Sequence, residues 1–244
     1  MRLESTSATD RGLIRPNNED ALLESAEIGL FAVADGMGGH AAGEVASGLA
    51  VEALRTEAAD GQGSGNPADP LVRAFSTANI AIRRKARSEP DKRGMGTTLT
   101  VLRFAPGTPD RAIIAHIGDS RAYRLRAGRV AQLTRDHTWV QERVDAGVLT
   151  IEQARSHPYS SILTRVLGTD DVVAPDIVAV DTEPGDVFLL CSDGLTGMIN
   201  DSELEQIMRE ESSLGEMAEQ MLGTALERGG FDNVTLVLVR RQPG

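Results

Sequence analysis

Four short acidic motifs sit at the ends of apolar runs in this chain, and their positions limit what it can fold into. Asp35 lies in VADGMGGH, Asp119 in HIGDS, Asp193 in LLCSDG and Asp232 in GFDNVTL. One carboxylate at a strand end is ordinary, whereas four predict acidic side chains gathered at one edge of a β core. Their mutual repulsion would cost several kcal/mol unless cations lay between them. Oxygen ligands without accompanying Cys or His pairs suit Mg²⁺ or Mn²⁺ rather than zinc.

Composition narrows the class of protein and of partner. The chain has 244 residues, a formal charge of −11 and 41% hydrophobic residues, enough for one large domain with a real core. The negative charge argues against nucleic acid or an anionic membrane as the main partner, although acidic proteins can carry local basic pockets. The chain has a single cysteine, contains no apolar stretch of about 20 residues and does not begin like a leader peptide. These features predict a soluble cytoplasmic protein.

Apolar patterning predicts strands in groups and helices in pairs. Continuous runs such as LFAVA and VFLLC are typical of strands covered on both faces. Strands are expected at 3–9, 28–34, 97–104, 112–117, 122–126, 177–180, 187–191 and 234–240, and helices at 41–59, 70–87, 202–209 and 214–228, with Asp201 or Ser202 as the N-cap of the third helix. This order favours an α+β fold with two helices on each outer face of a two-layer β core.

The whole chain, 1–244, is expected to form one domain. The linker-like stretch 61–70 is not a boundary, because acidic motifs lie on both sides of it. A polar, irregular segment at about 136–165 is expected to form a surface flap that selects substrates. The roles of His137 and His157, which lie in this flap, stay open; His116 lies in a strand and is expected to be packed.

Each motif also has a purely structural interpretation. The glycines after Asp35 would suit a tight strand-to-helix turn, and the motif is not a P-loop. HIGDSRAY could be a hairpin with Gly118 and Asp119 at its turn, and Asp232 with Asn233 could form a turn. Cys191 is interpreted as core packing, because a Cys-based phosphatase would need Arg six positions on, where Gly197 stands.

The order of the motifs resembles that of the bacterial PP2C-type (PPM) metal-dependent protein phosphatases. The motifs are RPNNED (Arg15–Asp20), DGMGGH (Asp35–His40), GTT (Gly96–Thr98), GDSR (Gly118–Arg121), SDG (Ser192–Gly194) and DNVT (Asp232–Thr235), and the resemblance runs from about Ser7 to Val239. It implies a four-layer α-β-β-α sandwich with two packed antiparallel sheets. It also implies hydrolysis of phosphoserine and phosphothreonine monoesters.

The resemblance further implies a role for each motif residue. Asp35 would bridge two metal ions, the Gly36 carbonyl would help hold one, and Asp193 with Asp232 would complete the other. Asp119 with Asp193 matches a third metal site. Arg15 would bind the phosphate, His40 would be the general acid, and Glu19 and Asp20 would hold metal-bound water, with Asn233 beside the ligands. Phosphorylated proteins and a cognate Ser/Thr kinase are the partners it implies, for an enzyme expected to be monomeric and free of any membrane.

Other classes fit the sequence less well. Calcineurin-like phosphatases need His ligands in motifs that GDSR and GFDN do not supply, and haloacid-dehalogenase phosphatases need an early DxD motif. A metal-stabilised module that binds phosphoproteins without turnover, and a phosphatase dedicated to one regulatory protein, stay open. The acidic surface predicts substrates with basic or neutral flanks, or folded kinases.

Overall fold

Two antiparallel sheets stack face to face in this computed structural model, which describes residues 2–38, 42–60, 68–104, 108, 110–210 and 213–243. The first has the order β1-β11-β10-β7-β8 and the second β2-β3-β5-β6-β9, with β4 paired to β3. The strands of the first sheet are β1 (Leu3–Asp10), β11 (Val234–Arg241), β10 (Val187–Cys191), β7 (Arg121–Arg126) and β8 (Arg129–Gln132). Those of the second are β2 (Asp20–Ser25), β3 (Leu30–Met37), β5 (Leu99–Phe104), β6 (Arg111–Ile117), β9 (Asp176–Asp181) and β4 (Gly96–Thr97).

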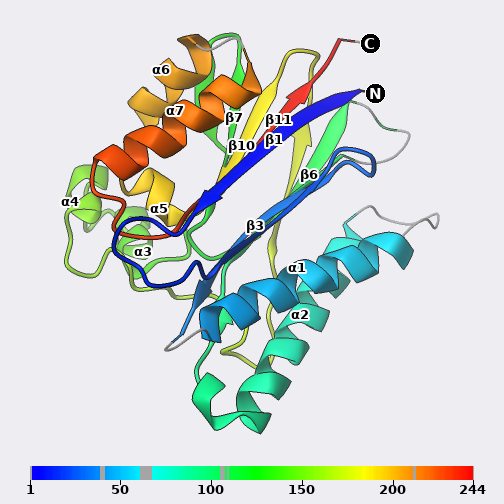
Figure 1. Ribbon diagram of the computed structural model, residues 1–244, viewed down its shortest axis with the longest axis vertical. Helices are drawn as coiled ribbons and strands as arrows, with labels where there is room; N and C mark the ends of the chain where they lie inside the picture. Colours follow the sequence, from blue (N-terminus) through cyan, green and yellow to red (C-terminus); the bar gives the residue numbers. More distant parts are fainter. Residues whose placement is uncertain are drawn as a thin grey trace.

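Helix pairs cover the outer face of each sheet (Figure 1). Helices α1 (Ala42–Asp60) and α2 (Asp69–Ser88) pack on the second sheet, while α6 (Asp201–Glu210) and α7 (Leu214–Glu227) pack on the first. The α-β-β-α sandwich predicted from the sequence is therefore confirmed. Among the described residues, no helix is long and apolar enough to cross a membrane.

Three apolar layers hold the sandwich together. In α2 the side chains of Leu71, Phe75, Ala78 and Ile82 are buried at helical spacing, so this helix buries one stripe against the sheet. Between the sheets, the rings of Phe31 and Phe188 each meet the ring of Phe104 edge to face, with centroids 6.3 and 5.6 Å apart. Aromatic rings favour this geometry, which helps to fix how the two sheets stack.

One structural alternative is excluded and one local expectation was wrong. Gly118 and Asp119 do not turn a hairpin, because β6 belongs to the second sheet and β7 to the first, so this turn carries the chain between sheets. The N-cap of α6 is Asn200 rather than Asp201 or Ser202. Its Oδ1 accepts hydrogen bonds from the backbone N–H groups of Ser202 and Glu203 at 3.0 and 3.1 Å.

The segment expected to form a flap contains two short helices, α3 (Trp139–Asp145) and α4 (Ile151–Arg155). Thr138 and Thr150 cap them by accepting hydrogen bonds from backbone N–H groups. The rings of His157 and Tyr159 pack on Trp139, with centroids 5.2 and 5.6 Å away, so His157 belongs to a small aromatic cluster inside this segment. Of the expected linker 61–70, residues 61–67 lie outside the described part of the chain.

Candidate metal centre

The acidic motifs come together where the two sheets end. Asp35 lies near the end of β3 and Asp119 follows β6; these two strands belong to the second sheet. Asp193 follows β10 and begins the short helix α5 (Asp193–Thr196), and Asp232 precedes β11, both in the first sheet. Burial and the other carboxylates raise the pKa of Asp35 well above its usual value. The four carboxylates predicted to gather at one edge therefore do so.

Asp20 lies directly opposite Asp35, because the two residues pair across β2 and β3. The Ser192 hydroxyl donates to Asp20 Oδ2 at 2.8 Å, whereas Asp20 Oδ1 is buried without a hydrogen-bond partner. Burial raises the pKa of Asp20 to about 7, although hydrogen bonds from Thr235 and Ser192 oppose the rise. An unpartnered buried carboxylate oxygen is costly and calls for a proton, a water molecule or a cation.

Asp119 and Asp193 form the other side of the cluster. Burial raises the pKa of Asp119 well above its usual value, and the neighbouring carboxylates of Asp193 and Asp136 add to the rise. Burial also raises the pKa of Asp193, with Asp232 adding to it, while a hydrogen bond to Asp35 lowers it. The net shift raises the pKa of Asp35, Asp119 and Asp193 alike, so each carboxyl group resists ionisation. Cations bound between the carboxylates would therefore lower the free energy of this arrangement.

A clamp of hydroxyl groups holds Asp35 and the Gly118–Asp119 turn together. Thr98 Oγ1 accepts from the Asp35 backbone N–H at 2.9 Å and lies 2.7 Å from Ser120 Oγ. Thr97 Oγ1 donates to the Asp35 backbone carbonyl oxygen at 2.9 Å. A Cβ on Gly118 would lie 2.5 Å from the Thr98 side chain, so the turn packs directly on this clamp. Sequence analysis assigned no roles to Thr98, Ser120 or Ser192; their only signal was their place inside motifs.

Gly36 occupies a position where no side chain fits. A Cβ there would lie 2.1 Å from the Gly43 backbone oxygen and 2.4 Å from that of Glu19. The Gly36 backbone N–H donates to the Glu19 carbonyl at 3.2 Å, which ties β3 to the start of β2. This close packing of backbones, rather than a strained φ angle, explains glycine beside Asp35.

The loop from Arg11 to Glu19 lies across the cluster and brings Arg15 to it. Arg15 Nη2 donates to Asp232 Oδ2 at 2.6 Å. Buried Asn233 shapes the loop, since its Nδ2 donates to the carbonyls of Arg11 and Asn17 at 2.9 Å and its Oδ1 accepts from the Glu19 N–H at 2.7 Å. Burial raises the pKa of Glu19, which a hydrogen bond from the Gly43 backbone opposes. The structure thus gives Asn233 a positioning role.

The cluster fits hard cations, but not as a cage made of side chains alone. In the described part of the chain, no group of three or more His, Cys, Asp or Glu side chains is arranged to hold a metal ion. An ion here would need further oxygen ligands, such as a backbone carbonyl or water, as hard cations commonly take. The unpartnered Asp20 Oδ1 and the opposed ionisation of the carboxylates are the observations that favour such an ion.

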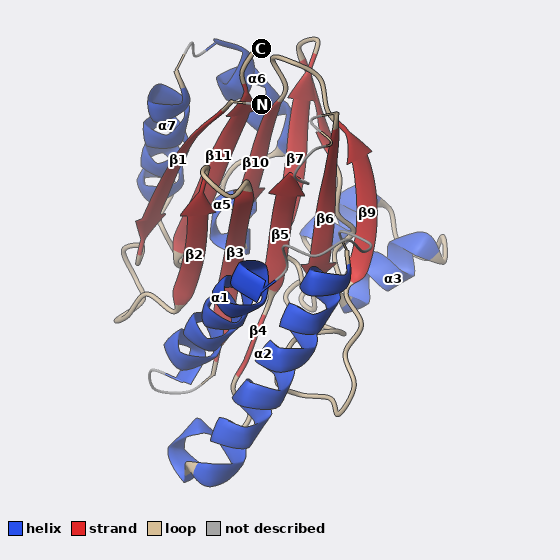
Figure 2. Ribbon diagram, turned by 90° about the vertical axis from the view of Figure 1, so that its right-hand side faces the viewer, coloured by secondary structure: helices blue, strands red, loops and turns tan. Residues whose placement is uncertain are grey.

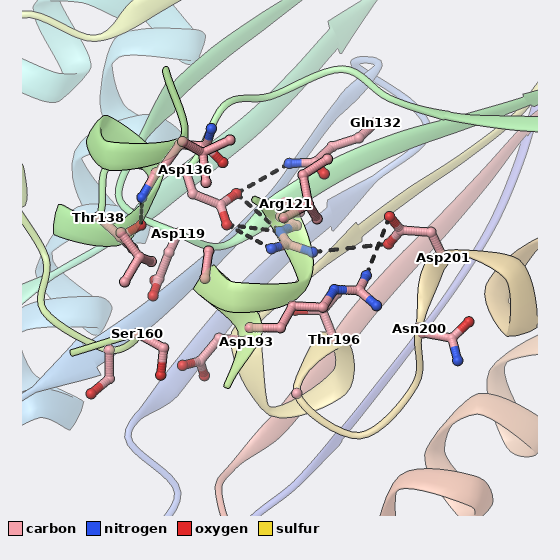
Figure 3. A pocket seen from close by; sticks show the side chains of 18 of the residues that line it. Asp119, Arg121, Gln132, Asp136, Thr138, Ser160, Asp193, Thr196, Asn200 and Asp201 are labelled. Atoms are coloured by element: carbon pink, nitrogen blue, oxygen red, sulfur yellow. Dashed lines mark hydrogen bonds and ion pairs between the residues drawn. The ribbon is translucent and has the colours of Figure 1, made fainter. Parts of the chain in front are cut away.

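A cavity of about 730 Å³ opens from the cluster between the flap segment and α5. Figure 3 shows Asp119 and Asp193 near one another, and Arg121 between Asp136 and Asp201. The guanidinium of Arg121 makes three hydrogen bonds to the Asp136 carboxylate at 2.9, 3.0 and 2.6 Å. The cavity is thus lined both by Asp119 and Asp193 of the carboxylate cluster and by a network of ion pairs.

Two stacked histidines support the Asp119 turn from behind. His137 Nδ1 accepts from the Gly118 backbone N–H at 3.0 Å, and its ring stacks on that of buried His116 with centroids 4.8 Å apart. Burial lowers the pKa of both rings, that of His116 to about 3, so both are neutral at physiological pH. His137 therefore links the flap to the candidate centre. Cys191 is buried in the core as expected, whereas His40 lies outside the described residues.

Comparison with known proteins agrees with the geometry. The family model described as protein phosphatase 2C matches residues 15–229. The chain is 43% identical over 236 residues to the serine/threonine protein phosphatase PstP of Mycobacterium tuberculosis, covering 97% of this chain and 44% of that protein. It therefore spans less than half of that relative. With the serine/threonine phosphatase stp of Listeria monocytogenes it shares 39% identity, over 96% of this chain and 94% of the relative.

Solved structures give the same result for the fold. A crystal structure of the M. tuberculosis phosphatase PstP/Ppp superposes with a TM-score of 0.92 at 42% identity, covering all of both chains. The catalytic domain of PstP in complex with two manganese ions superposes with a TM-score of 0.89 at 40% identity, covering 99% of each chain. With these matches over nearly its whole length, the chain belongs to the protein phosphatase 2C family.

Proposed function

We propose that this chain is a metal-dependent protein phosphatase that hydrolyses phosphoserine and phosphothreonine monoesters. The observation that carries the proposal is the gathering of Asp35, Asp119, Asp193 and Asp232 from both sheets around an unpartnered buried oxygen of Asp20. The names of the relatives, which are serine/threonine phosphatases, support the same reaction.

The centre would hold Mn²⁺ or Mg²⁺ ions, because its ligands are oxygen atoms. Asp35, the Gly36 carbonyl, Asp193 and Asp232 would hold two of them, as the two manganese ions of the PstP catalytic domain support. Asp119 with Asp193 would hold a third. When bound, such ions supply Lewis-acid polarisation of the phosphate and a water molecule that is acidic enough to act as a nucleophile.

The chain's own residues would orient the phosphate and move protons. Arg15 lies on an exposed loop and offers a planar fork of donors, which suits the phosphoryl oxygens once it leaves Asp232. Glu19 and Asp20 would position water through their carboxylates, and Asn233 keeps the loop that bears Arg15 in place. His40 is proposed as the acid that protonates the departing seryl or threonyl oxygen.

The partners would be phosphorylated proteins, among them a cognate Ser/Thr kinase and its substrates. We propose a monomeric, cytoplasmic enzyme whose whole chain, 1–244, is one phosphatase domain, with the flap at about 136–165 choosing among substrates. The cavity between that flap and α5 supports this last role, because it opens directly from Asp119 and Asp193. Neither nucleic acid nor a membrane is an expected partner for a chain of charge −11.

Phosphate release from a phosphothreonine peptide by metal-stripped protein tests the proposal. Release should require added Mn²⁺ or Mg²⁺ and should vanish in Asp193→Asn, while circular dichroism shows the variant folded. A protein that binds Mn²⁺ and phosphopeptide yet releases no phosphate under any metal would instead be a binding module, or a phosphatase limited to one protein substrate.

A further inference from the structure

A hollow of about 560 Å³ lies at the C-terminal end of α2, outside the candidate metal centre. Three arginines line it, and none of the lining residues in the described part of the chain is acidic. The lining residues include Arg83 and Arg87 from the last turns of α2, Arg93 and Gly94 from beyond the 3-10 turn η1 (Pro90–Lys92), and Gly168 and Thr169 from the segment after the flap. We call these six residues the basic hollow.

The charge of this region is opposite to that of the chain. Residues 83–93 contain six Arg or Lys and two Asp or Glu, a net charge of +4, within a chain of −11. Glu89 and Asp91 balance Lys85 and Lys92, whereas Arg83 and Arg87 share one carboxylate, that of the exposed Asp171. Within the described residues Arg93 makes no ion pair. The basic hollow therefore keeps an excess of positive charge.

Helix electrostatics explain only part of this arrangement. Cations in the last turn of a helix complement the partial negative charge of its C-terminus, which accounts for Lys85 and Arg87. Arg93 lies beyond the helix and its C-cap, and Gly168 comes from a distant segment. The macrodipole gives no reason for Arg93, from beyond the helix, to line the same cavity as Arg83 and Arg87, whereas an anionic ligand does.

Backbone pairing joins the basic hollow to the metal centre. Leu167 and Thr97 exchange backbone hydrogen bonds of 3.1 and 2.9 Å, and Thr97 Oγ1 donates to the Asp35 carbonyl. Gly168 follows Leu167 directly, so standard backbone dimensions place it within about 15 Å of Asp35. In Figure 2, α2 extends past the ends of the strands.

We propose that the basic hollow binds a second anionic group of the polypeptide substrate, a phosphate monoester or a carboxylate. This inference rests on the proposed phosphatase function. An extended peptide advances about 3.3 Å per residue, so the second anion would lie about four to six residues from the phosphoresidue being hydrolysed. Substrates are then expected to have basic or neutral residues around the phosphoresidue in general, because the protein surface is acidic. At about four to six residues from the phosphoresidue, an anionic residue is expected instead.

Peptides that differ in one group test the inference. Each carries one phosphothreonine, and at a position two to eight residues away on either side it has alanine, glutamate or a non-hydrolysable phosphonate. We expect KM to fall at least about fivefold for glutamate or phosphonate at four to six residues, because two partly exposed guanidinium groups each contribute a fraction of a tenfold change. The phosphonate arm separates phosphate recognition from carboxylate recognition.

The variant Arg87→Gln/Arg93→Gln should remove this preference and leave hydrolysis of p-nitrophenyl phosphate unchanged. The matched control is Arg73→Gln/Arg84→Gln, which removes the same charge from α2 at positions that do not line the hollow and should keep the preference. Loss of the preference in both variants would overturn the inference, as would equal KM values for all peptides in the wild-type protein.

Binding of the same peptides to the Asp193→Asn variant, followed by fluorescence anisotropy, separates this inference from the proposed function. Tighter binding of the glutamate and phosphonate peptides, lost with Arg87→Gln/Arg93→Gln, would support the basic hollow even if no phosphate were released. Equal binding of all peptides to Asp193→Asn, when the wild-type protein hydrolyses p-nitrophenyl phosphate, would overturn the inference and leave the proposed phosphatase function in place.

Discussion

Two arginines near the candidate centre differ in how they are held. The Arg15 side chain is 51% exposed, and its only ion pair among the described residues is to Asp232. The Arg121 side chain is 21% exposed and is held by three hydrogen bonds to Asp136, whose side chain is 10% exposed, and by one to the Tyr123 hydroxyl. The comparison indicates that Arg15 is available to a substrate phosphate, whereas Arg121 is fixed as part of the structure.

The difference in burial between the two arginines explains why the exposed one, Arg15, can bind a substrate. An exposed ion pair is worth at most about 1 kcal/mol, so Arg15 can exchange Asp232 for another anion at little cost. A largely buried charge that loses its partner costs several kcal/mol, so Arg121 cannot leave Asp136. Among the described residues, Asp119, two residues before Arg121, makes no ion pair of its own, although Arg121 opposes the rise that burial causes in its pKa. Such a carboxylate suits a site for a bound cation.

Asp193 lies between these two sides, so its removal should have the largest effect. Asp193→Asn removes one negative charge from the proposed two-ion site that Asp193 shares with Asp35 and Asp232. It removes the same charge from the proposed third site that Asp193 shares with Asp119. We expect kcat to fall by about 10³-fold or more, equivalent to about 4 kcal/mol. Steady-state hydrolysis of p-nitrophenyl phosphate at saturating Mn²⁺ measures it, with Asp201→Asn, also in the cavity lining, as the charge-matched control. Activity within tenfold of wild type would show that Asp193 holds no essential ion.

Breaking the Arg121–Asp136 pair should act on stability. Arg121→Ala leaves a mostly buried carboxylate unpaired, and we expect a loss of about 3 kcal/mol in the free energy of unfolding. Urea denaturation measures this loss, and the double variant Arg121→Met/Asp136→Leu should recover much of it. If Arg121→Ala had the same urea midpoint as the wild-type protein, the Arg121–Asp136 ion pair would not be needed for stability, and Arg121 would not be a structural residue.

Changing Arg15 should give the opposite result. Arg15→Ala is expected to lower kcat/KM about 100-fold, or about 2.7 kcal/mol, because a phosphate loses a charge-assisted pair of hydrogen bonds. Unfolding should stay within about 0.5 kcal/mol of wild type, since the residue is exposed. Arg11→Ala, in the same loop, is the control. A stability loss as large as that of Arg121→Ala would remove the distinction between the two arginines.

The smallest expected effect concerns pH. The pKa of Asp20 is raised to about 7 in the folded chain, above its unfolded value of 3.8, so the folded state binds the extra proton between these values. The stability of metal-stripped protein should therefore fall as pH rises from about 4 to 7, by about 2 kcal/mol. Urea midpoints across this range test it, and Asp20→Asn should make the profile less steep, with a remaining slope from Asp35, Asp119 and Asp193, whose pKa values burial also raises. A stability that rises over the same range would show that Asp20 ionises normally.

Periodicity and motif spacing predicted most of the framework and the acidic cluster, for physical reasons. Strands such as Val187–Cys191 are continuous apolar runs, and the acidic residues stand where such runs stop. Strand β2 was missed because DALLES lacks the β-branched residues that mark strands, and β8 because it is mostly exposed. The hairpin at Gly118 stayed open as an alternative because local sequence does not say which sheet the next strand joins.

The basic hollow and the hydroxyl clamp could not be predicted, since both depend on contacts between distant segments. Arg83 and Gly168 line the same hollow, next to the point where Leu167 pairs with Thr97, and the Thr98 hydroxyl lies 2.7 Å from that of Ser120, 22 positions on. Likewise, the different states of Arg15 and Arg121 follow from tertiary partners and not from residue type. The sequence therefore predicts which residues lie at the site, and the structure shows which of them are exposed enough to bind a substrate.

Calorimetric titration of the metal-stripped protein with Mn²⁺ tests the central claim, that the carboxylates gather to hold cations. The account predicts at least two bound ions per chain, with the stoichiometry or affinity reduced in Asp193→Asn and the tighter sites kept in Asp119→Asn. No binding up to millimolar Mn²⁺, in protein shown to be folded, would contradict it.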